Sequence, residues 1–155
     1  MLHPNAKTVF IGPCMAKKAE IKEPDLKGAI DYVLTYEELR DLFTTTDIDL
    51  EHLEEDNVPH ASRAGIRYAY AGGVAEAVAA TVKRLDPNRK IEVKVRRADS
   101  VPDCKAMIDS ILKGNREGNF FEGMGCRGGC VGGPKALVPK EQGKLNVMAY
   151  LSLIH

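Results

Sequence analysis

Hydrophobic and polar positions change their period several times along the chain, and each change predicts a different element. Thr8–Ile11 is a short run of β-prone residues that Gly12 closes, and Ile30–Leu34 is a second run of the same kind. Between them, Met15–Ile21 can form a helical turn that stops before Pro24. The beginning of the chain therefore predicts a strand, a short helix and a second strand.

Three capping or periodic patterns predict longer helices. Thr35 and Glu38 form a T-x-x-E capping box in front of an apolar helical face. The segment 68–85 repeats apolar residues at helical spacing and is the strongest helical pattern. Ser100 and Asp103 suggest a second capping box, which precedes an apolar stripe that ends near residue 114.

The order of these elements predicts the fold class. Residues 91–95 alternate between apolar and charged side chains, which predicts a half-buried strand. Residues 44–66 are polar and predict an exposed connection with a short ordered piece within 48–53. Because strands and helices alternate, we expect an α/β structure with a small, mostly parallel sheet flanked by helices. Residues 1–155 are expected to form a single domain.

Composition and charge exclude several classes of partner. The 22 basic and 22 acidic side chains cancel, so no charge excess indicates a nucleic-acid partner or a disordered acidic tail. No apolar run approaches the roughly 18 residues that a membrane span needs. The segment MLHPNAKTVF lacks the basic and apolar regions of a signal peptide, so a cytoplasmic location is expected.

The stretch Phe120–Pro134, FFEGMGCRGGCVGGP, carries the most informative chemistry. It is rich in glycine, which lets the backbone approach a bulky group, and Cys126 and Cys130 stand four positions apart in it. Thiolates bind soft or borderline metals, and backbone N–H groups of such loops can donate to cluster sulfides. The composition favours an iron–sulfur cluster over a zinc site or a metal-free structural loop.

A second cysteine motif, C-x-x-K-x-x-E, begins just past the first predicted strand. Lys17 and Glu20 are three positions apart, so on a helical turn they share a face with Cys14. A lysine at a metal site could donate to an anionic ligand, whereas the alternative is a solvated pair with Glu20.

The cysteine count leaves this site one thiolate short. Cys14, Cys126 and Cys130 supply three thiolates, while a cubane commonly takes four protein ligands. The remaining cysteine, Cys104, lies on the apolar stripe of a predicted helix, so we expect it to pack in the core.

Together the two motifs resemble signatures of the iron-only (FeFe) hydrogenases. Cys14, Lys17 and Glu20 match M-P-C-x-x-K-x-x-E. The family's F-x-E-x-M-A-C-x-G-G-C-x-x-G-G-G-Q-P is matched by Phe120, Glu122, Met124, Cys126, Gly128, Gly129, Cys130 and Gly133. The segments VLTYEELRDLF and AGGVAEAV also resemble family segments, so the similarity runs from about residue 8 to residue 138.

The resemblance implies that the chain is the C-terminal half of a hydrogenase catalytic domain. That domain holds the H-cluster, a 4Fe–4S cluster joined to a diiron subsite with CO and cyanide ligands, for reversible reduction of protons to dihydrogen. By the resemblance, Cys14 and Cys126 would be ligands of the cubane. Cys130 would ligate the cubane and also bridge it to the diiron subsite.

The resemblance also implies roles for three residues beside the diiron subsite. Lys17 would donate to a cyanide, Glu20 would orient Lys17, and Met124 would pack against the diiron unit. It further implies an anaerobic setting, a ferredoxin or similar electron carrier as partner, and the N-terminal remainder of the hydrogenase.

Two departures from the family change the expected activity. The signature T-S-C-C-P, which carries the fourth cubane cysteine and a proton-relay cysteine, is absent from this sequence, so we expect the chain alone to be inactive. Gly12 stands where the family usually has methionine, and we expect that change to loosen the pocket. The alternatives are a non-catalytic hydrogenase-like iron–sulfur protein in regulation or cluster assembly, and a zinc-binding module.

Overall fold

The chain divides into two compact units, each built on a pair of parallel strands. The computed structural model describes residues 3, 5–54 and 61–153. One unit consists of Met1–Asn57 with Gly133–Val138, and the other of Val58–Gly132 with Pro139–His155. The expected α/β class with parallel strands and flanking helices is confirmed, but the strands form two two-stranded sheets instead of one.

The first unit pairs β1 (Val9–Ile11) with β2 (Tyr32–Leu34) in parallel. The crossover between them contains α1 (Ala16–Glu20) and a short turn of 3-10 helix, η1 (Pro24–Leu26). Gly12 N donates to Leu34 O at 3.0 Å, so the pairing reaches one residue past β1. Both strands and the short helix were predicted from the sequence.

The second helix of this unit, α2 (Tyr36–Thr45), begins at the predicted capping box. The buried Thr35 hydroxyl accepts from Glu38 N, and a Glu38 carboxylate oxygen accepts from Thr35 N at 2.8 Å. A 3-10 turn, η2 (Leu50–His52), lies within the ordered piece predicted for 48–53. Residues 55–60 of the predicted connection lie outside the described residues.

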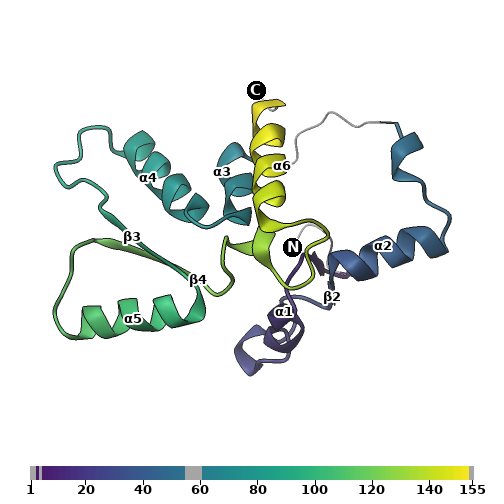
Figure 1. Ribbon diagram of the computed structural model, residues 1–155, viewed down its shortest axis with the longest axis horizontal. Helices are drawn as coiled ribbons and strands as arrows, with labels where there is room; N and C mark the ends of the chain where they lie inside the picture. Colours follow the sequence, from purple (N-terminus) through teal and green to yellow (C-terminus); the bar gives the residue numbers. More distant parts are fainter. Residues whose placement is uncertain (1–2, 4, 55–60, 154–155) are drawn as a thin grey trace. The chain divides into compact units, whose positions relative to one another are not determined.

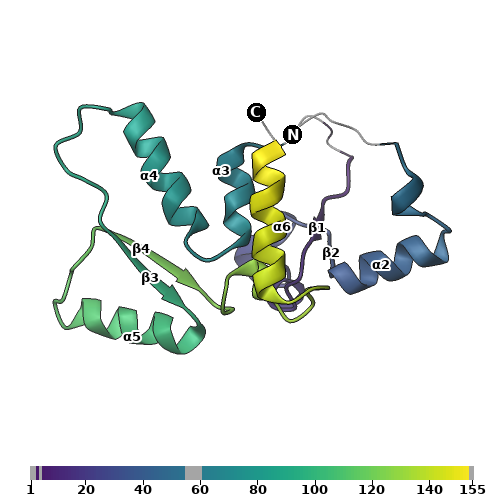
Figure 2. The same cartoon turned by 45° about the horizontal axis from the view of Figure 1, so that its top comes forward.

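The second unit pairs β3 (Val95–Asp99) with β4 (Phe120–Met124) in parallel, joined by α5 (Val101–Leu112). Figures 1 and 2 show α5 and α4 (Gly73–Leu85) on opposite sides of this strand pair. The unit also contains α3 (Arg63–Ile66), the 3-10 turn η3 (Arg67–Ala69) and α6 (Lys140–Leu153). Ser100 caps α5 as predicted, and its hydroxyl accepts from Asp103 N at 3.2 Å.

The helix predicted over 68–85 begins later than expected. Residues 67–69 form η3, and Gly72 has a φ of 94°, so α4 starts only at Gly73. The turn is so tight that a Cβ on Gly73 would lie 1.6 Å from Arg67 O. Apolar periodicity alone did not show this break, because the alanines and tyrosines on either side fit a helix equally well.

Two predictions about the second sheet were wrong. The strand expected at 91–95 runs over Val95–Asp99, and Ile91 is 63% exposed. The segment FFEGM, expected to begin a glycine-rich loop, forms the strand β4. Pairing explains both errors: β3 takes its register from β4, with Val95 opposite Phe120, and the alternation before Val95 has no partner strand among the described residues.

None of the helices in the described ranges combines the length and apolar character that crossing a bilayer requires.

Candidate functional site

Cys14 lies at the carboxyl edge of the first strand pair, where the sequence predicted it. β1 ends at Ile11, and the buried Gly12 and Pro13 carry the chain to the half-buried Cys14. Pro13 O accepts a hydrogen bond from Lys135 N at 3.1 Å, which fixes the backbone just before the cysteine. This edge of a parallel pair is where α/β folds commonly bind ligands.

Lys17 and Glu20 lie on one face of α1 and form an ion pair. The Lys17 ammonium is 2.6 Å from one Glu20 carboxylate oxygen and 2.7 Å from the other. The two side chains are 35% and 42% exposed, so the pair is reached by water and adds little to stability. Its geometric effect is to hold the Lys17 side chain in one position.

The space beside Gly12 is occupied by a side chain from β1. The Phe10 ring lies against it, and a Cβ on Gly12 would be 2.9 Å from Phe10 Cε1. The side chain two residues earlier thus fills the space beside Gly12, while the loosened pocket expected from this glycine stays a prediction. Sequence reasoning missed Phe10 because its position indicated only a strand residue.

The Cys126–Cys130 loop is fixed by its backbone. Gly128 and Gly129 have φ values of 88° and 83°, a conformation that favours glycine. Gly129 N donates to Cys126 O at 3.0 Å, which closes the turn. Cys126 is half-buried, and Cys130 is exposed at the start of the 3-10 turn η4 (Cys130–Gly132).

Two further hydrogen bonds join this loop to the rest of its unit. Gly128 N donates to the Asp99 carboxylate at 2.8 Å, and Gly128 O accepts from Ala71 N at 2.9 Å. A Cβ on Gly129 would lie 2.5 Å from Ala71 N, so glycine is required for this close approach. The loop is thereby attached both to the end of β3 and to the segment that leads into α4.

Glu122 is a structural residue of this site to which the sequence analysis gave no role. It is buried at 5% exposure, and its two carboxylate oxygens accept from Gly72 N at 2.8 Å and Ala75 N at 3.1 Å. It therefore caps α4 and joins that helix to β4, the strand that leads into the cysteine loop. The sequence did contain a sign of this role, because Glu122 is the glutamate of the F-x-E-x-M signature.

Tyr70, the residue before Ala71, also lies against the cysteine loop: a Cβ on Gly129 would be 2.7 Å from Tyr70 C. Burial, together with the hydrogen bond that its hydroxyl donates to Glu76 at 3.0 Å, raises the pKa of the Tyr70 phenol above its ordinary value. The side chain is therefore a neutral donor at physiological pH.

Cys104 was expected in the core, but it is half-buried on α5, with its sulfur facing the second sheet. Its sulfur is 3.5 Å from Met124 O and 3.9 Å from Ala98 O. A Cβ on Gly123 would lie 3.0 Å from that sulfur, so the glycine in β4 makes room for it. Met124 is half-buried at the end of β4.

The six predicted site residues divide between the units. Cys14, Lys17 and Glu20 belong to the first unit, and Met124, Cys126 and Cys130 to the second. All four cysteines lie in described parts of the chain, and none forms a disulfide. Within each unit, no three described His, Cys, Asp or Glu side chains gather as they would around a metal ion.

The donor set nevertheless fits the predicted cofactor in kind. The three cysteines form no disulfide, and thiolates are the usual ligands of iron–sulfur clusters. Two of them flank a turn whose backbone is fixed by hydrogen bonds to Asp99 and Ala71.

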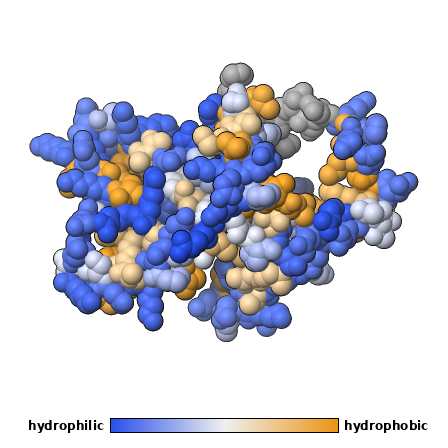
Figure 3. Space-filling view, in the orientation of Figure 1, coloured by the Kyte–Doolittle hydropathy of each residue, from blue (hydrophilic) through white to orange (hydrophobic). Residues whose placement is uncertain are grey.

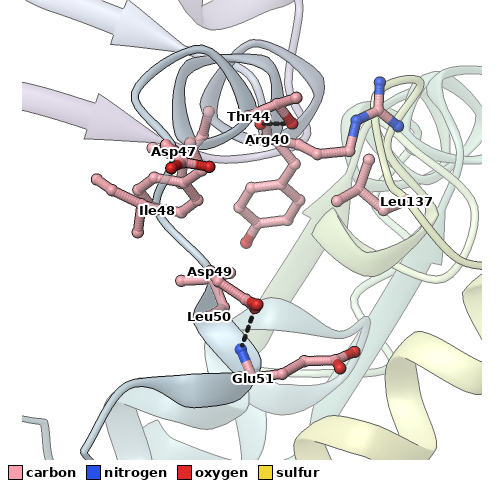
Figure 4. Close-up of a pocket in the computed structure, with 11 residues that line it drawn as sticks. Arg40, Thr44, Asp47, Ile48, Asp49, Leu50, Glu51 and Leu137 are labelled. Atoms are coloured by element: carbon pink, nitrogen blue, oxygen red, sulfur yellow. Dashed lines mark hydrogen bonds between the residues drawn. The ribbon is translucent and has the colours of Figure 1, made fainter.

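A separate hollow in the first unit contains none of these residues. It measures about 630 Å³ and lies between α2, the turn that follows it and Leu137 (Figure 4). The part of the surface that holds α2 and η2 shows apolar patches (Figure 3), and Leu42, Ile48 and Leu50 are exposed there. The lining has no cysteine, so this hollow does not correspond to the predicted cluster site.

Comparison with known proteins identifies similar sequences. A protein-family profile described as "Iron only hydrogenase large subunit, C-terminal domain" matches residues 2–134. Iron hydrogenase 1 of Clostridium pasteurianum is 27% identical, over 92% of this chain and 31% of that protein. The periplasmic [Fe] hydrogenase large subunit of Nitratidesulfovibrio vulgaris is 31% identical, over 85% of this chain and 39% of that protein. The chain thus spans well under half of either relative.

Solved structures share the fold. A [FeFe]-hydrogenase studied for stepwise H-cluster assembly superposes with a TM-score of 0.65 at 19% identity, over 92% of this chain and 52% of that one. A [FeFe]-hydrogenase of Chlamydomonas reinhardtii gives a TM-score of 0.64 at 19% identity, over the same shares.

Proposed function

Because the chain belongs to the family formed by the C-terminal domains of iron-only hydrogenases, we propose that it forms part of an H-cluster pocket in a longer protein. The observation that carries the proposal is the Cys126–Cys130 loop. Its cysteines match the family signature, and its glycine turn is fixed by hydrogen bonds to Asp99 and Ala71. A fixed turn presents two thiolates in a constant geometry, as a cluster requires.

The ligands of the cluster would be Cys14, Cys126 and Cys130. Cys14 and Cys126 would hold the 4Fe–4S part, and Cys130 would hold both that part and the diiron subsite. When bound, the group supplies the redox chemistry for reversible reduction of protons to dihydrogen. The protein's own work is to hold the iron, tune its potential and exclude water.

Three other side chains would serve the diiron subsite. Lys17 would donate from its ammonium to an anionic cyanide ligand, for which a cationic donor is suited. Glu20 orients that ammonium, as the 2.6 Å ion pair supports. Met124, at the end of β4 and two residues before Cys126, contributes an apolar surface that excludes water.

Anaerobic reconstitution of the chain with iron and sulfide tests the proposal. We expect a broad brown absorbance, which Cys126→Ser removes because a thiolate ligand is lost. Cys104→Ala is the matched control: it keeps the absorbance and costs only stability, about 1–3 kcal/mol for a small buried side chain. A colourless protein that retains zinc would contradict the proposal, as would loss of colour in Cys104→Ala.

Catalysis by this chain alone is not expected. Its own donor set is three cysteines, one fewer than a cubane commonly takes, and a fourth thiolate and a proton relay would come from the remainder of the parent protein. A ferredoxin or similar carrier would supply the electrons. We expect no hydrogen evolution from the reconstituted chain with a chemical reductant, measured by gas chromatography.

A further inference from the structure

At the end of β1, the Phe10 ring fills the space that a side chain at position 12 would occupy. Residues two apart along a strand point to the same side, so the side chains at positions 10 and 12 are neighbours. A Cβ on Gly12 would lie 2.9 Å from Phe10 Cε1 and 3.2 Å from Phe10 Cζ. Gly12 is buried, and the ring is half-buried. The two positions therefore cannot both carry a large side chain in this arrangement.

The same ring also contacts the lysine of the site. The Lys17 ammonium lies 5.9 Å from the centroid of the Phe10 ring, within the range of a cation–π contact. The ammonium is at the same time paired with Glu20. Two groups from different elements, a ring on β1 and a carboxylate on α1, thus restrict one cation.

We propose that Phe10 is a positioning residue for Lys17, and that its ring occupies the space beside Gly12. The significance of this role rests on the proposed function, because Lys17 matters only where it faces an anionic ligand. A side chain added at position 12 would therefore have to displace the ring at position 10.

A double-mutant cycle in the metal-free chain tests whether the side chains at positions 10 and 12 compete for the same space. Gly12→Met alone should raise the unfolding equilibrium constant by about tenfold or more, since overpacking at such a contact is costly. In a Phe10→Val background the same change should cost much less, because the ring is gone. Denaturant unfolding of the four proteins measures this coupling. Equal effects of Gly12→Met in both backgrounds would overturn the proposal.

The positioning role has its own readout, which a purely structural residue would not move. In NMR relaxation measurements, Phe10→Leu should lower the order parameters of the Lys17 side chain, because the ring no longer restricts the ammonium, whereas Phe10→Tyr should keep them. Val9→Ala, at a position that is exposed on the same strand, is the matched control and should leave them unchanged. Unchanged Lys17 order parameters in Phe10→Leu would overturn the role.

Neither measurement needs a cluster, so the two proposals fail separately. A colourless chain after reconstitution would end the proposed function and leave the Phe10–Gly12 coupling intact. If the effects of the changes at positions 10 and 12 on stability simply add, in a chain that binds iron, the coupling is refuted and the proposed function stands.

Discussion

At the scale of single residues, Glu122 shows how one buried carboxylate can support a binding loop without being part of it. Its oxygens accept from two backbone N–H groups at the start of α4, where the helix dipole also favours negative charge. The residue lies on β4, two positions before Met124 and four before Cys126. Glu122 therefore fixes the strand from which the cysteine loop begins.

Replacing this carboxylate tests its role. Glu122→Gln keeps the shape but turns one acceptor into a donor that faces a backbone N–H, so we expect a loss of about 1–3 kcal/mol in the free energy of unfolding. Denaturant unfolding measures the loss. Glu92→Gln, an exposed change in the same unit, is the control and should stay within about 0.5 kcal/mol of the original protein. A Glu122→Gln protein as stable as that control would contradict the assignment.

At the scale of elements, α2 illustrates a helix start that the sequence predicts in full. The capping box at Thr35 and Glu38 forms as expected, and Lys18 on the crossover adds an ion pair to the same carboxylate. The hydrogen bond from Lys18, followed by those from the Thr35 backbone and hydroxyl, lowers the pKa of Glu38 from 4.5 to about 2.

This shift makes the start of α2 sensitive to acid. Because the pKa of Glu38 is lower in the folded chain, its contribution to stability is fully present above about pH 4.5 and is lost as the pH falls through about 2. In an NMR titration, the signal of the Glu38 carboxyl carbon should change with a midpoint of about 2. Glu38→Gln should remove the acid-dependent change in amide exchange at the start of α2. A midpoint at the ordinary value would show that the capping box is open in solution.

Other elements depend on partners that a local pattern does not contain. β3 could not be placed from its own alternation, because its register is set by pairing with β4, a strand that follows only after the whole of α5. The start of α4 depends on the left-handed Gly72 and on Glu122 from a distant strand. Caps and short strands that rest on neighbouring residues were predicted well, whereas these two features arise from contacts between segments far apart.

At the scale of the whole molecule, motif spacing identified the residues proposed to carry the chemistry. Cys14, Cys126 and Cys130 were predicted as ligands in this way, and Cys104 was set apart from them; it is half-buried, with its sulfur against β4. Phe10 and Glu122 were given no roles, because a ring and a carboxylate that act by contact leave no spacing pattern. The motifs thus predict a donor set, while the residues that would support it follow from the fold.

The proposed site requires that the thiolates of Cys14, Cys126 and Cys130 bind one metal group. Anaerobic titration of the metal-free chain with Co²⁺ tests this directly, because the sulfur-to-cobalt charge-transfer absorbance grows with the number of bound thiolates. We predict that Cys14→Ser and Cys126→Ser each remove about a third of this absorbance per bound ion, while Cys104→Ala leaves it unchanged. An absorbance that is unaffected by Cys14→Ser would contradict a site shared by the three thiolates.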